Sequence, residues 1–173
     1  MPSRPEGSHR RILPYDIVAD PPRILGSVAE PYNLPVPPRY TDIADLIAPA
    51  EDPNRWFSPE ELSTAEWLRG RGLDVASVER RTGHLLKTPD AVAVGHPITI
   101  ELKRAVGTAN SIVQRLRNAR WQARHVVIDL RDTGTTLDLA GSALSSALRM
   151  YGDHLDEVVL ILSNDLSVGW HHG

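Results

Sequence analysis

Regular spacing of apolar residues begins at residue 58. Ser58, Pro59 and Glu61 form a helix start signal, because serine caps the first turn, proline suits its first position and glutamate its third. The predicted helix continues to about Arg69 and stops at Gly70. Its inward positions are Leu62, Ala65 and Leu68.

Three strand patterns follow this helix. Residues 73–80 alternate in the manner of a half-buried strand. Residues 88–94 and 98–104 are two further apolar segments, and they are joined around Gly95. Pro97 has no N–H group to close a two-residue hairpin, so the sequence favours a four-residue connection.

The C-terminal half alternates helices with apolar strands. A predicted helix over residues 108–120 precedes a strand at 125–130, and a helix over 137–151 precedes strands at 157–162 and 166–170. The inward faces of these helices are Ile112, Leu116, Ala119 and Ala123, and Ala140, Leu144, Ala147 and Tyr151. Two continuously apolar strands around a helix predict a parallel crossover in a central sheet. The expected fold is α/β, a mixed central sheet flanked by helices in the order α-β-β-β-α-β-α-β.

The N-terminal third has a different composition. Eleven of the 14 prolines lie before residue 54, which excludes long regular helices or strands there. We therefore predict a proline-rich arm or linker over residues 1–54 and a folded domain over residues 55–173. Short apolar pieces, such as Ile12–Leu13 and Ile17–Val18, can pack on that domain or on a partner.

Composition narrows the possible classes of protein. A chain of 173 residues with 41% hydrophobic and 24% charged residues is ordinary for one globular domain. It has no cysteine, which excludes disulfides and thiolate metal sites. No apolar run approaches the ~20 residues of a membrane span, and the first residues lack the apolar stretch of a secretory signal.

Positive charge is concentrated in one stretch, although the net charge is −3. No acidic residue lies between Lys103 and Arg124, and the basic residues there are Lys103, Arg104, Arg115, Arg117, Arg120 and Arg124. Such a stretch can bind the phosphates of a nucleic acid, with Trp121 as an aromatic plane for a base. The alternative is a merely solvated helix surface, with Trp121 in the core.

The candidate chemistry lies on the two strands joined around Gly95. A four-residue connection places Asp90 opposite Glu101, and like charges at facing positions are unfavourable unless a cation lies between them. Lys103 points to the same face as Glu101, whereas Leu102 points to the core. Two carboxylates and a lysine are suited to metal-assisted phosphodiester hydrolysis, in which the carboxylates hold Mg²⁺ and the lysine orients the attacking water. The alternative is a turn dipeptide followed by an ordinary exposed strand face.

The order of elements and this motif resemble the PD-(D/E)xK nuclease superfamily over roughly residues 58–162. The resemblance implies that Asp90 and Glu101 are metal ligands, that Lys103 is the catalytic lysine and that the Leu102 carbonyl completes the metal shell.

A tighter resemblance is to the C-terminal nuclease domains of contact-dependent growth-inhibition toxins and related polymorphic toxins. It rests on Glu66, on the segment Lys87–Asp90, on Glu101–Lys103 and on Gln122 followed by alanine. The resemblance implies that Glu66 helps to complete the metal site, although Glu66 can instead pair with Arg69. Glu79 is a competing third carboxylate. Gln122 can position substrate or a water molecule, or cap its helix.

The resulting hypothesis is a nuclease that depends on Mg²⁺, with Mn²⁺ or Zn²⁺ as alternatives, and that cuts tRNA or DNA. As a toxin it would act in the cytoplasm of a target cell and be neutralised by an immunity protein. Such domains end very long secreted proteins, whereas this sequence begins at a methionine, so an excised or orphan module is expected. The alternatives are a housekeeping or phage-defence DNA endonuclease and a non-catalytic binding module.

Overall fold

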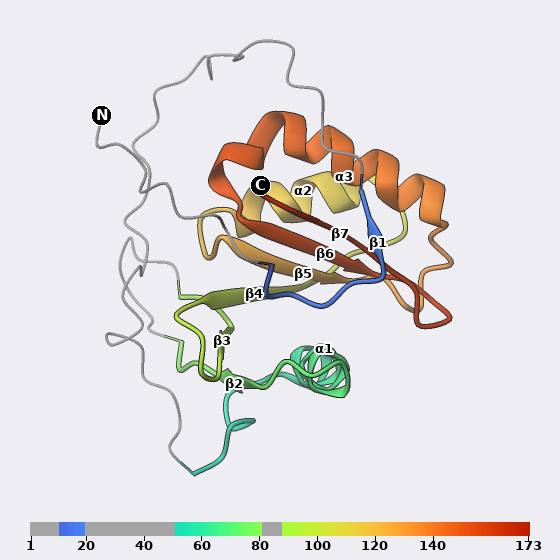
Figure 1. Cartoon of the computed structure of the whole chain (residues 1–173). Helices are drawn as coiled ribbons and strands as arrows, with labels where there is room; N and C mark the ends of the chain where they lie inside the picture. Colours follow the sequence, from blue (N-terminus) through green and yellow to red (C-terminus); the bar gives the residue numbers. More distant parts are fainter. Residues whose placement is uncertain (1–10, 20–50, 81–87) are drawn as a thin grey trace, which may run out of the picture.

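Seven strands form one mixed sheet, with helices on both of its faces (Figure 1). The structure is a computed structural model that describes residues 11–19, 51–80 and 88–173. Along the chain, the elements are β1 (Ile17–Val18), α1 (Pro59–Gly70), β2 (Val75–Ser77), β3 (Ala91–Ala93), β4 (Thr99–Arg104), α2 (Ala109–Ala119), β5 (His125–Asp129), α3 (Leu137–Tyr151), the 3₁₀ turn η2 (Gly152–His154), β6 (Glu157–Ile161) and β7 (Ser167–His171). Across the sheet, the strand order is β1-β7-β6-β5-β4-β3-β2.

The centre of the sheet is parallel. Strands β4, β5 and β6 run in the same direction, with Leu102 opposite Val127 and Val127 opposite Val159. The connections between them pass through α2 and α3, which confirms the predicted parallel crossover. Strands β2 and β3 extend the sheet antiparallel from β4, and β7 extends it antiparallel from β6.

The alternation of side chains along the central strands produces two apolar cores. Val126 and Ile128 of β5 face α2 and α3, whereas Val127 faces the other side, where α1 packs. The inward positions predicted for the helices over 108–120 and 137–151 are buried, except that Tyr151 is half-buried. Apolar side chains on both faces explain why the central strands are continuously hydrophobic.

The helix boundaries follow the predicted signals closely. Ser58 caps α1 in a capping box with Glu61, and Pro59 occupies the first turn. Thr108 caps α2, and α3 covers the predicted range from Leu137 to Tyr151. The helix predicted to reach residue 120 ends at Ala119.

Two strands are shorter than their sequence patterns suggest. The pattern at 73–80 yields only β2, and at its start the Leu73 N–H donates to the Leu68 carbonyl at the end of α1 rather than to a strand. The pattern at 88–94 yields only β3. Pro89 has no N–H to donate to the sheet, the Leu102 N–H of β4 donates to the Asp90 side chain, and the Asp90 carbonyl accepts the Val78 N–H from the segment after β2.

Part of the predicted arm belongs to the sheet. Strand β1 pairs in parallel with β7, and Leu13 and Tyr15 are buried in the core that α1 covers. The division of the chain at residue 54 stays a prediction, and residues 1–10 and 20–50 lie outside the described part. Within that part, no helix is both long enough and apolar enough to cross a membrane.

Candidate active site

The pairing of β3 with β4 has the predicted register. Ala91 lies opposite Ile100 and Val92 opposite Thr99, and the Ala93 N–H donates to the Ile98 carbonyl at 3.2 Å. The connection is therefore the four-residue form that Pro97 favours. The next position of this register places Asp90 at the level of Glu101.

Asp90 is held at the start of β3 by groups from two other segments. Its Oδ2 accepts the Leu102 N–H at 2.9 Å, and its Oδ1 lies 3.3 Å from the Arg80 guanidinium. Burial raises the pKa of Asp90, the Lys103 ammonium lowers it, and the Glu61 carboxylate raises it, with a net upward shift. The buried Asp90 carboxylate is thus fixed in place, but the nearby positive charges only partly offset the cost of burying its negative charge.

Glu101 is fully buried in the middle of β4. Its Oε1 accepts the Gln122 side-chain amide at 2.5 Å and pairs with the Lys103 ammonium, whereas its Oε2 has no hydrogen-bond partner within the described residues. Burial and then the Asp90 charge raise the pKa of Glu101 to about 8, against the opposing effect of Lys103. This shift favours the protonated form of Glu101 near neutral pH.

Lys103 connects the acid pair to a surface pocket. The Lys103 side chain follows Glu101 on one face of β4, whereas Leu102 is buried in the core on the α1 side, as predicted. The pocket has a volume of about 220 Å³ and is formed by α1, β4 and α2. Its lining residues are Ser58, Glu60, Glu61, Thr64, Leu102, Lys103, Arg104 and Arg115. Lys103 thus contacts the buried Glu101 carboxylate and also lines a space that a ligand can enter.

The acid of α1 that shares a contact with Asp90 is Glu61, whereas the sequence indicated Glu66. Glu66 is exposed and does not line the pocket, and Glu79 is also exposed. The Glu61 carboxylate accepts a hydrogen bond from the Ser58 N–H at 2.9 Å. It also pairs with the Arg80 guanidinium, and the same guanidinium contacts Asp90. The sequence indicated only a capping role for Glu61, because the capping box was enough to explain a glutamate at that position.

Gln122 is brought to Glu101 by the turn after α2. Its backbone N–H donates to the Ala119 carbonyl at 2.8 Å, and its side chain reaches across to β4. Gln122 therefore joins the cluster that the sequence motif predicted, while its backbone also takes part in the helix end.

The predicted phosphate-binding residues divide into two groups. Arg115 and Arg117 are exposed on α2, and neither has an ion-pair partner among the described residues. Arg104 is also exposed, but it pairs with Asp132 at 2.9 Å. Of these three, Arg104 and Arg115 line the pocket beside Lys103 and Arg117 does not.

The remaining members of that set lie beyond the end of α2 and have structural contacts. Arg120 is only 8% exposed, with its guanidinium over the rings of Trp121 and Tyr151. Arg124 donates to Asp156 at 2.8 Å. Trp121 is half-buried and its ring lies against His154. The structure therefore does not present Arg120 and Arg124 as an open basic surface.

The acid pair is compatible with a hard divalent cation. Within the described residues, no group of three or more histidines and carboxylates converges as a ready metal site. Mg²⁺ commonly uses only one or two protein carboxylates and keeps several waters. Asp90 and Glu101 provide two carboxylates, and the Glu101 Oε2 without a donor is an available ligand atom. The role predicted for the Leu102 carbonyl stays a prediction.

Comparison with known proteins gives one family match. Residues 87–166, just under half of the chain, match the sequence profile described as the contact-dependent growth inhibition CdiA C-terminal domain. This stretch contains Asp90, Glu101, Lys103 and Gln122. The searches of curated proteins and of solved structures found no match.

Proposed function

We propose that the protein is a metal-dependent nuclease that serves as a toxin effector. The match over residues 87–166 supports a polymorphic toxin effector of the CdiA type. The observation that carries the nuclease proposal is the buried pair Asp90 and Glu101, joined by Lys103 to a pocket that basic residues line. Such a toxin would act inside a target cell, and its producer would need an immunity protein.

A divalent cation would be held by Asp90 and Glu101, with water in its other positions. When bound, it would lower the pKa of a coordinated water and offset negative charge on the phosphate. Binding requires Glu101 to lose the proton that it holds near pH 7, so affinity should rise as pH approaches 8. Mg²⁺ and Mn²⁺ are the first cations to test.

The protein's own groups have distinct tasks in this proposal. Lys103 keeps a positive charge at the boundary between the buried acids and the pocket, where it can orient water and stabilise negative charge on the phosphate. Gln122 donates to the Glu101 Oε1, and the other oxygen, Oε2, has no hydrogen-bond partner among the described residues and is left for the cation.

The substrate's phosphates would enter through the pocket. Arg115 is the strongest candidate to bind them, because it lines the pocket and has no carboxylate partner among the described residues. Arg104 can assist after giving up part of its pairing with Asp132. Because phosphates are common to both nucleic acids, tRNA and DNA remain the two substrates to compare.

The decisive experiment is a cleavage assay with purified protein on plasmid DNA and on total tRNA, with Mg²⁺, Mn²⁺ or EDTA. Cleavage of either substrate that requires the cation supports the proposal. Asp90→Asn, Glu101→Gln and Lys103→Met should each lower the rate by roughly 10² or more. Near-normal cutting by these variants would reject the site.

Glu157→Gln is the matched control. Glu157 is also a buried carboxylate on a central strand, and burial also raises its pKa, but it bonds the backbone of Ile12 and Leu13. Its replacement should lower stability while the folded fraction keeps its specific activity. Equal loss of activity in Glu101→Gln and Glu157→Gln would mean that the acids act only through folding.

A further inference from the structure

Arg80 joins two carboxylates that come from different elements. Its Nη2 contacts Glu61 on α1 and Asp90 at the start of β3. The Arg80 side chain is 62% exposed, whereas the side chains of Glu61 and Asp90 are 14% and 4% exposed. A largely solvated guanidinium thus pairs with two largely buried acids from outside.

Arg80 contacts Oδ1 of Asp90, the carboxylate oxygen that does not accept the Leu102 N–H. Asp90 Oδ2 is committed to the Leu102 N–H at 2.9 Å, so Oδ1, which lies 3.3 Å from Arg80, is the oxygen left for a ligand. A divalent cation on Oδ1 would lie within a few ångströms of the guanidinium. Two positive charges at such a distance repel each other appreciably, even when partly screened.

We propose that Arg80 is a positioning residue that competes with the divalent cation for Asp90. Without the cation, Arg80 holds Asp90 and Glu61 together and offsets their repulsion. When the cation binds, the guanidinium gives up Oδ1 and, being largely exposed, can turn toward solvent or toward a substrate phosphate. This inference rests on the proposed function.

The competition sets the sign of a measurable effect. If Arg80 only oriented Asp90, removing it would weaken cation binding. If Arg80 competes, removing it takes away a positive charge next to the site and strengthens cation binding. Cation-free stability should change in the opposite direction, because Asp90 and Glu61 lose their shared counter-charge.

The test is calorimetric titration of Mn²⁺ into the full chain and its variants, with melting temperature measured with and without Mn²⁺. Arg80→Gln should bind Mn²⁺ roughly tenfold more tightly than the unaltered chain and should melt at a lower temperature without it. Arg80→Lys, which keeps the charge, should stay close to the unaltered chain. Arg104→Gln is the matched control, since Arg104 is an exposed arginine in the same region whose ion-pair partners among the described residues are Asp132 and Glu60.

Unchanged or weaker binding by Arg80→Gln, while the unaltered chain binds Mn²⁺, would overturn the inference and leave the proposed function intact. A gain of the same size in Arg104→Gln would also overturn it, because the effect would then be one of general charge. Absence of Mn²⁺ binding in every variant would remove the cation from the proposed function and the competition with it.

Discussion

Glu101 couples the chemistry of the site to the stability of the fold. Its carboxyl has an ordinary pKa of 4.5 and a folded-state pKa of about 8. Between these values, the folded protein keeps a proton that the unfolded chain has lost. The free energy of unfolding should therefore fall as pH rises through this window, by at most about 1.4 kcal/mol per pH unit.

Glu101→Gln is neutral at every pH and should remove most of this slope. Urea unfolding at about pH 5 and about pH 8 measures the slope, and a smaller one should remain because burial also raises the pKa values of Asp90 and Glu157. If the variant kept the full slope, Glu101 would be ionised in the folded protein. The Lys103 charge would then outweigh burial.

At the scale of single residues, the sequence predicted which acidic and basic side chains lie together, while their roles stay a prediction. Asp90, Glu101 and Lys103 come together because a strand places alternate side chains on one face and because the chain makes the four-residue connection that Pro97 favours over a two-residue one, and both rules are local. The Glu61–Arg80 contact was not predicted, because it joins a helix to the segment after β2. No periodic pattern in the sequence predicts a contact between segments that lie so far apart along the chain.

At the scale of elements, α2 provides a matched pair of arginines. Arg115 and Arg117 are both exposed on this helix, but only Arg115 lines the pocket beside Lys103. Arg115→Glu should weaken nucleic-acid binding for all sequences alike and lower the salt slope by about one unit, because one phosphate contact is lost. Arg117→Glu should change both quantities less.

Fluorescence titration of a short labelled oligonucleotide over a range of salt concentrations measures these slopes. Mn²⁺ affinity serves as the control, because Asp90 and Glu101 lie on other segments than α2 and should bind the cation equally well in both variants. Equal effects of the two substitutions would indicate a diffuse basic surface on α2 rather than entry through the pocket.

Helices were easier to predict than strand ends. The start signal at Ser58 and the apolar stripes predict α1, α2 and α3 within a residue or so. Strand length depends on hydrogen bonds made by other segments, such as the Leu73 N–H bond to the end of α1. The pattern of side chains does not contain that information.

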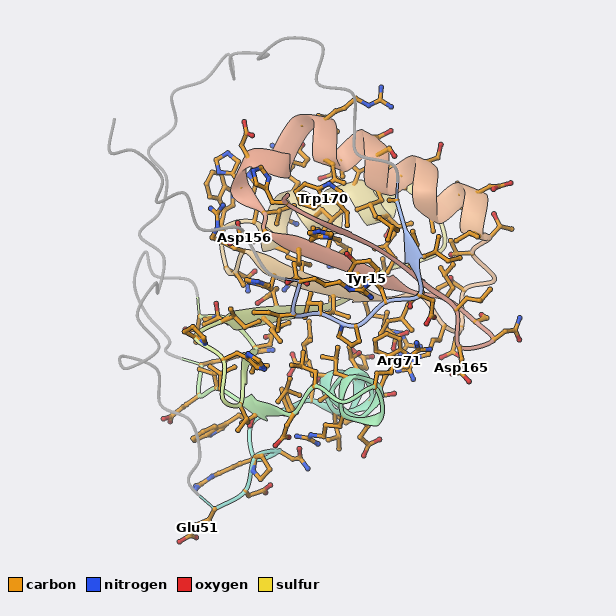
Figure 2. The ribbon with its side chains drawn as sticks, in the orientation of Figure 1. Tyr15, Glu51, Arg71, Asp156, Asp165 and Trp170 are labelled. Carbon is orange, nitrogen blue, oxygen red and sulfur yellow. The ribbon has the colours of Figure 1, made fainter. Side chains whose placement is uncertain are left out.

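At the scale of the whole molecule, residues 11–19 close one edge of the sheet. The Glu157 carboxylate accepts the backbone N–H groups of Ile12 and Leu13 at 2.6 and 2.7 Å. Arg71 binds Asp16 at 2.7 Å and the Asp165 carbonyl at 2.5 Å, and Figure 2 shows Arg71 beside Asp165 near the turn between β6 and β7. Composition alone predicted that this segment belongs to an arm, because most prolines lie around it. In the structure, its few apolar residues form an edge strand and part of a core.

Gly169 tests whether this segment is part of the folded unit. A Cβ at residue 169 would lie 2.3–2.7 Å from ring atoms of Tyr15, closer than real contacts allow. Gly169→Ala should therefore displace Tyr15 and its 2.7 Å bond to His171, at a cost of about 1–3 kcal/mol of unfolding free energy. Gly141→Ala is the control, because this position inside α3 has open space around it and should gain about 0.5–1 kcal/mol.

The two substitutions should thus shift urea unfolding midpoints in opposite directions. Combining Gly169→Ala with Tyr15→Ala should cost less than the sum of the two single changes, since the second change removes the ring that the new methyl group strikes. If Gly169→Ala were neutral, Tyr15 would not be docked on β7 in solution. Residues 11–19 would then belong to an arm after all, and the folded unit would begin near residue 54, as the proline distribution alone suggests.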